Sequence, residues 1–135
     1  MALVHHDLCF GCGQANLFGL QIELERTGDG AVAGRFFVKQ DHQGPPGHAH
    51  GGIVGAALDE AMALASGEGA ESAITAHFEV DLRAPAPIGG FLQLEASVEP
   101  AGERRLQGTA TARREDGTLV AEARAVLVRL RPPAS

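Results

Sequence analysis

The stretch HAHGGIVGAALDEAMALA, residues 48–65, decides how this chain folds, because one pair of adjacent acids interrupts an almost wholly apolar run. Apolar residues fall all round a helix drawn through residues 53–65, which is typical of a helix buried on every side. A carboxylate inside such a helix is costly unless it is paired, hydrogen-bonded or reaches water. We therefore expect a helix over residues 51–66 in which at least one of Asp59 and Glu60 serves a function.

Strand-like segments flank this helix on both sides. Alternating or β-rich patterns separated by turn-forming residues predict two strands before it and four after it, at residues 20–26, 31–39, 73–82, 90–99, 104–114 and 119–130. The dipeptide Asp116-Gly117 is a strong hairpin signal between the last two strands. The order β-β-α-β-β-β-β predicts an α+β fold, in which a curled antiparallel sheet of about six strands wraps one central helix.

Length and composition limit what the chain can do. Its 135 residues predict a single domain over residues 1–135, with a loop segment at 1–19 and a frayed tail at 131–135. A net charge of −6 and the lack of Trp and Tyr argue against a nucleic-acid partner. The longest apolar run is too short to cross a bilayer and the N-terminus lacks a signal-peptide pattern, so we expect a cytoplasmic protein without a membrane partner.

One motif links the predicted helix to known proteins. His50, Gly51 and Gly52 open the helix, and Asp59 follows nine residues after the histidine, which gives the spacing H-G-G-x(6)-D. With this motif, with TAHFEVDLRAPAPIG (75–89) and with CFGCGQANLFGLQIEL (9–24), the chain resembles the hotdog-fold acyl-CoA thioesterases of the phenylacetate-pathway type. The resemblance implies a hotdog fold, an acyl-CoA substrate, no cofactor, and a homodimer or dimer-of-dimers tetramer with active sites between subunits.

The residue types in this motif suit thioester hydrolysis. The reaction needs a polarised carbonyl and an activated water or nucleophile, and a helix N-terminus supplies N–H donors and partial positive charge. Glycines let a ligand approach the backbone closely, so we expect Gly52 to polarise the carbonyl and Gly51 to bind substrate beside it. Asp59 is the candidate general base or nucleophile, and the sequence leaves these two roles open.

Four further residues are candidates for the site. Thr75 lies where one branch of the family places a helper hydroxyl, and His50 is either catalytic or a helix cap. Many relatives carry an Asn in the loop before H-G-G, and Gln43 is the nearest amide here. Glu60 is a candidate for substrate binding, with a structural role, paired with an Arg or facing a subunit boundary, as the alternative.

The helix rise predicts that the site is shared between subunits. Gly52 and Asp59 lie seven residues apart on nearly the same helix face, but about 10 Å apart along the axis. One small carbonyl cannot contact both within one helix. A second helix running antiparallel across a two-fold axis would place Gly52 of one subunit opposite Asp59 of the other.

The only cysteines, Cys9 and Cys12, form a single CxxC. This is half of a structural zinc site, which His5 and His6 or a second subunit would have to complete. We expect a metal-free structural turn, and a metal site and a redox or disulfide role are the alternatives.

Two other functions fit the same motif. A hotdog hydratase or dehydratase acting on acyl thioesters would use His50 as its base. A non-catalytic acyl-CoA-binding protein would keep the groove and lose turnover.

Overall fold

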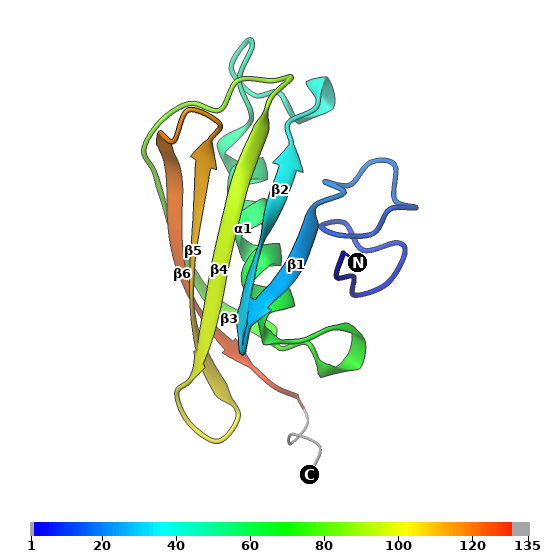
Figure 1. Cartoon of the computed structure of the whole chain (residues 1–135), viewed down its shortest axis with the longest axis vertical. Coiled ribbons are helices and arrows are strands. Elements are labelled where there is room, and N and C mark those ends of the chain that lie inside the picture. The colour runs from blue at the N-terminus through cyan, green and yellow to red at the C-terminus, as the bar shows by residue number, and fades with distance from the viewer. Residues whose placement is uncertain (1, 131–135) are drawn as a thin grey trace.

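The computed structural model describes residues 2–130, and it contains one six-stranded sheet curled around one long helix (Figure 1). The elements along the chain are β1 (Glu23–Gly28), β2 (Ala31–Phe37), the short 3-10 helix η1 (Gln40–His42), α1 (Gly51–Ser66), the 3-10 helix η2 (Gly69–Glu71), β3 (Ile74–Leu82), β4 (Phe91–Pro100), β5 (Arg105–Arg114) and β6 (Leu119–Val128). The strands lie in the order β1-β2-β4-β5-β6-β3, and every neighbouring pair is antiparallel. The predicted fold class and element order are confirmed.

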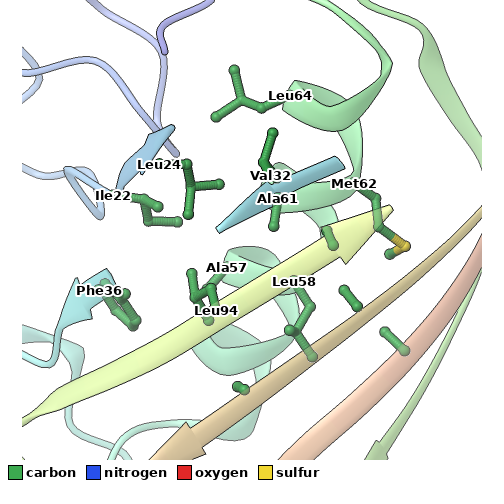
Figure 2. Packing of buried hydrophobic residues seen from close by; sticks show 14 of the residues in the cluster. Ile22, Leu24, Val32, Phe36, Ala57, Leu58, Ala61, Met62, Leu64 and Leu94 are labelled. Atoms are coloured by element: carbon green, nitrogen blue, oxygen red, sulfur yellow. The ribbon is translucent and has the colours of Figure 1, made fainter. Parts of the chain in front are cut away.

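The core lies between α1 and the concave face of the sheet (Figure 2). Large buried side chains from the strands, such as Phe36 and Leu94, belong to the same cluster as the buried helix residues Leu58 and Met62 (Figure 2). Small helix residues such as Ala57 let the strands approach closely. The helix occupies residues 51–66, as predicted from the sequence.

Within one chain, α1 is not buried on every side, so that prediction is wrong for the single subunit. Nine of its sixteen residues are buried. Gly52, Ala56, Asp59 and Ala63, which recur at helical spacing along one side, remain partly or fully exposed. We call these four residues the open face of α1. The sheet wraps only one side of the helix, and the open face is apolar apart from Asp59.

The first strand begins three residues later than predicted. Gln21 has a positive φ of 52°, which breaks the extended run. The N–H groups of Leu20 and Ile22 donate to the carbonyl oxygens of Phe10 and Gly11, at 2.7 and 2.9 Å. This part of the predicted strand therefore fastens the N-terminal segment instead of joining the sheet. The other strand boundaries differ from the prediction by at most two residues.

The N-terminal segment, residues 2–19, forms turns without a helix or strand, as expected, and lies beside β1 and α1 (Figure 1). The predicted frayed tail, residues 131–135, lies outside the described residues. None of the helices formed by residues 2–130 has the length and apolar character needed to span a bilayer.

Strand β3 is an edge strand that pairs with β6 alone. Its register shifts between Thr75 and His77. Irregularities of this kind change the direction of a side chain. This one lies at Thr75, whose side chain contacts Asp59 of α1.

Candidate functional site

The Asp59 carboxylate and the Thr75 hydroxyl lie together between α1 and the start of β3. Thr75 Oγ1 donates a hydrogen bond of 2.6 Å to Asp59 Oδ1, and both residues are partly exposed. The two residues are sixteen positions apart in the chain. The structure thus brings together two of the residues that the sequence analysis assigned to the site. Their catalytic roles stay predictions.

His50 caps the start of α1. Its Nδ1 accepts a hydrogen bond of 2.9 Å from the Gly52 N–H, and its carbonyl oxygen accepts from Ile53 and Val54. Among the described residues, Gly51 is then left as the first-turn residue whose N–H has no hydrogen-bond partner. The Gly52 N–H, which the sequence predicted as the donor to the substrate carbonyl, already donates to His50. The free N–H belongs to its neighbour, Gly51.

The cap also fixes the donor pattern of the His50 ring. Because Nδ1 accepts from Gly52, the neutral imidazole carries its proton on Nε2. The residue is exposed, so the Nε2–H is available to a ligand at the start of α1. The cap role foreseen for His50 is confirmed, and its catalytic role stays a prediction.

A groove of about 440 Å³ opens at this end of the helix. Gly51, Val54 and Leu82 contribute to its lining, which is completed by Val120 of β6 and by residues of the loop before α1 and of the segment that follows β3. A cavity of this size can hold part of a small-molecule ligand. Gly51, whose N–H has no hydrogen-bond partner among the described residues, therefore belongs to the wall of this groove.

Gln43 belongs to the loop that leads into α1. Its side-chain oxygen accepts a hydrogen bond from the Gly47 N–H, and its backbone pairs with Ala49. The amide oxygen thus stabilises the loop, and a substrate-binding role for Gln43 stays a prediction.

Glu60 has partners different from those of Asp59. Its Oε2 lies 2.8 Å from His5 Nδ1 and accepts a hydrogen bond of 3.6 Å from Cys9 Sγ. The structural alternative of pairing with an Arg is wrong, because the N-terminal segment supplies a histidine instead. Burial lowers the pKa of His5, but the hydrogen bond and charge of Glu60 reverse this shift and raise the pKa to about 9. A substrate-binding role for Glu60 stays a prediction.

More than half of the chain matches a protein-family model. A family model described as the thioesterase superfamily matches residues 46–121, which include α1 and both Asp59 and Thr75. A curated relative, the acyl-coenzyme A thioesterase THEM4 of Xenopus laevis, is 28% identical over 91 residues. The match covers 67% of this chain and 41% of that protein, so the chain spans about two fifths of the length of this relative.

Several solved protein structures have a fold similar to that of this chain. A crystal structure of a thioesterase superfamily protein superposes with a TM-score of 0.79 and 27% identity, over 92% of this chain and 63% of that one. The PaaI protein from the phenylacetic acid degradation operon of E. coli matches with a TM-score of 0.74 and 20% identity, over 84% and 82% of the two chains. The smu.793 protein of Streptococcus mutans, solved with acetyl-CoA bound, gives a TM-score of 0.74 and 17% identity, over 84% and 91%. At these lower identities the last two show the shared fold alone.

Proposed function

Because the chain belongs to the thioesterase superfamily, we propose that it hydrolyses an acyl-CoA thioester to the free acid and CoA, with Asp59 as general base or nucleophile. The observation that carries this proposal is the Asp59–Thr75 hydrogen bond on the otherwise apolar open face of α1. A carboxylate kept partly exposed in such a setting, and held by a hydroxyl, is poised to act on a ligand.

The bond from Thr75 leaves one carboxylate oxygen of Asp59 for chemistry. As a general base, Asp59 takes a proton from a water whose oxygen adds to the thioester carbon, and the tetrahedral intermediate then expels CoA thiolate. As a nucleophile, a carboxylate oxygen adds to the same carbon, CoA thiolate leaves, and water hydrolyses the mixed anhydride. Both routes give the same products.

Donors at the start of α1 would polarise the thioester carbonyl. The free Gly51 N–H and the exposed His50 Nε2–H are the groups best suited to this role, in place of the engaged Gly52 N–H. The positive end of the helix dipole adds to their effect. Each such donor stabilises a developing oxyanion by roughly 3 kcal/mol.

The distance along α1 supports a site shared between two subunits. Gly51 and Asp59 are separated by about 12 Å of helix, at about 1.5 Å per residue, which is too far for one carbonyl to contact both. The apolar open face of α1 is suited to pack against a second copy. The edge strand β3, where Ile74 and Leu82 are 52% and 54% exposed, offers a second surface for pairing. A homodimer, alone or within a dimer of dimers, would place the Gly51 N–H of one subunit near Asp59 of the other.

The test is a panel of acyl-CoA substrates of different chain length, with detection of free thiol and free acid. We expect wild-type protein to release CoA thiol, and Asp59→Asn to lose at least about 100-fold of turnover, the size typical of a positioned base. Asp29→Asn, which alters an exposed turn residue, serves as the matched control and should behave like wild type. Circular dichroism verifies that each variant is folded.

Two other results would contradict the proposal. Hydration or dehydration of an acyl thioester without thiol release would indicate the hydratase or dehydratase function. Tight acyl-CoA binding without any turnover would indicate a binding protein.

A further inference from the structure

Four potential metal ligands meet where the N-terminal segment crosses the middle of α1. They are His5, Cys9, Cys12 and Glu60, and their ligand atoms all lie within 4.8 Å of one another. His5 Nδ1 lies 3.6 Å from the Sγ of each cysteine, and Glu60 Oε2 lies 3.6 Å from Cys9 Sγ. The cluster joins two parts of the chain that are 51 residues apart at Cys9 and Glu60.

These separations fit a tetrahedral zinc ion. With zinc–sulfur and zinc–nitrogen bonds of about 2.3 and 2.0 Å, a sulfur and a nitrogen on one zinc lie about 3.5 Å apart. The two His5–cysteine distances of 3.6 Å agree with this value, and so does the Glu60–Cys9 distance of 3.6 Å. The His5–Glu60 separation of 2.8 Å would open to about 3.3 Å around a metal, a small rotation of the side chains.

The groups around the cluster support this geometry. The second ring nitrogen of His5, Nε2, lies 2.8 Å from the Ser72 hydroxyl, which orients the ring with Nδ1 toward the cysteines. Metal-bound histidines characteristically have such a partner on their other nitrogen. Cys12 Sγ in turn accepts a hydrogen bond of 3.1 Å from the His5 N–H.

The cluster is also shielded and tightly built. Cys12 is fully buried, and the side chains of His5 and Glu60 are each only 13% exposed. A Cβ atom on Gly11, between the two cysteines, would overlap the Glu60 side chain. A Cβ atom on Gly13 would likewise overlap the backbone of Asp7. The glycines of CFGCG thus let the loop close over the carboxylate.

We propose that His5, Cys9, Cys12 and Glu60 bind one Zn²⁺ ion as a structural site that fastens the N-terminal segment to α1. Two thiolates with one imidazole and one carboxylate form a donor set suited to zinc. Four protein ligands fill the coordination sphere, so the site stabilises the fold and leaves no position for a substrate. This inference replaces the metal-free turn expected from the sequence, and it does not depend on the proposed thioesterase function.

The first test measures metal in the full chain. Tag-free protein from a zinc-supplemented culture, purified without chelators, should contain about one zinc per chain by elemental analysis. Removal of the zinc with a strong chelator should lower the melting temperature, and ZnCl₂ should restore it. Titration of the metal-free protein with Co²⁺ should give the visible absorption of a tetrahedral cobalt–thiolate site.

Matched variants then test the ligand set. His5→Ala and Cys9→Ser should lose stoichiometric zinc, whereas His6→Ala, which changes the exposed neighbouring histidine, should retain it. Glu60→Gln should weaken zinc binding, and Asp7→Asn, in the same exposed turn as His6, should not. Wild-type zinc content and the cobalt spectrum do not require any variant to fold.

Three results would overturn the inference. One is wild-type protein with well below 0.1 zinc per chain and no cobalt–thiolate absorption, which would leave His5 and Glu60 as a plain ion pair. Another is a Cys9–Cys12 disulfide, seen as the absence of free thiols when the purified protein is denatured with a chelator and without reductant, which would release both thiols from a zinc site. The third is zinc that His5→Ala retains and His6→Ala loses. Thiol release from acyl-CoA is measured separately, so failure of this inference is distinguishable from failure of the proposed function.

Discussion

In the proposed mechanism, the hydroxyl of Thr75 prepares the carboxylate of Asp59 for chemistry. The 2.6 Å bond holds Oδ1 and restricts rotation of the carboxylate. Without it, the Asp59 side chain can rotate, and the oxygen meant for catalysis leaves the reacting position. In the proposed mechanism, Thr75 is a positioning residue.

Replacing the hydroxyl tests this role. We expect Thr75→Val to lower kcat by about 10-fold or more while KM changes little, because a hydrogen bond to a charged group contributes about 1.5–3 kcal/mol. Thr75→Ser keeps a hydroxyl and should retain most of the activity. Equal activity of Thr75→Val and wild type in steady-state assays of CoA release would contradict the positioning role.

Some contacts of the site could be predicted from the sequence and others could not. The motif spacing pointed to Asp59, and the family resemblance placed a helper hydroxyl at Thr75, so both residues were assigned to one site before their hydrogen bond was seen. The partners of Glu60 were not predictable. Cys9 precedes Glu60 by 51 residues, and a contact between residues so far apart in the chain leaves no local sequence pattern. The free donor was assigned to Gly52 and not to Gly51, because the choice depends on the rotation of the His50 ring.

At the scale of elements, the Gly51 N–H at the start of α1 is free among the described residues. A substitution at Gly51 can remove this donor and leave the His50 cap in place. Proline has no N–H and is tolerated at the first helical position, which is Gly51. The preceding residue, His50, is extended with φ −63° and ψ 134°, as a residue before proline requires.

We therefore expect Gly51→Pro to lower kcat by about 100-fold, the loss typical of one oxyanion donor, with the fold retained. Gly51→Ala is the matched control, because it adds a Cβ near the flexible end of Leu82 but keeps the N–H. Assays of CoA release measure both variants. If Gly51→Ala lost as much activity as Gly51→Pro, crowding of the groove would explain the loss and the donor role would be wrong.

The loop before α1 has its own pH dependence through His42. This buried residue packs against Phe36, its Nδ1 accepts from the Lys39 N–H at 3.0 Å, and its carbonyl accepts from the His50 N–H at 2.8 Å. Burial, together with the charge of Lys39, lowers the pKa of His42. The unfolded chain then binds a proton near pH 6.5 that the folded chain resists, so His42 favours unfolding as the pH falls below about 6.5.

We expect the slope of the free energy of unfolding against pH, measured by urea denaturation between about pH 7.5 and about pH 5.5, to be more positive in wild type than in His42→Gln. The raised pKa of His5 contributes with the opposite sign, and this contribution is common to both proteins. His48→Gln, which alters the partly exposed histidine of the same loop, should leave the slope unchanged. An identical slope in His42→Gln and wild type would mean that His42 does not couple protonation to stability.

The sequence predicted best those elements whose ends are set by residues close by in the chain. The helix begins after the capping His50 and ends at Ser66, just before the capping Gly67, where φ is 149°. The start of β1 was missed because Leu20 and Ile22 have strand-like neighbours but bond to the N-terminal segment. A tertiary hydrogen bond of this kind overrides an alternating pattern, which carries no information about the partner.

At the scale of the whole molecule, the sheet encloses only part of the helix that the sequence marked for burial. The open face of α1 and the edge of β3 remain for a partner surface. In the proposed dimer, a second subunit would cover the side of the helix that one chain leaves open, as the sequence pattern predicts. The apolar open face and the separation of Gly51 from Asp59 are both accounted for by a two-fold pair of subunits.

Complementation between two inactive variants tests this central claim most directly. Gly51→Pro and Asp59→Asn homodimers should each be nearly inactive. In a hybrid dimer, one site combines the intact Gly51 of the Asp59→Asn chain with the intact Asp59 of the Gly51→Pro chain, and the other site carries both defects. Random exchange makes half of the dimers hybrid, so CoA release should recover to at most about a quarter of wild type. No recovery, with subunit exchange demonstrated by mass spectrometry, would contradict a site shared between subunits.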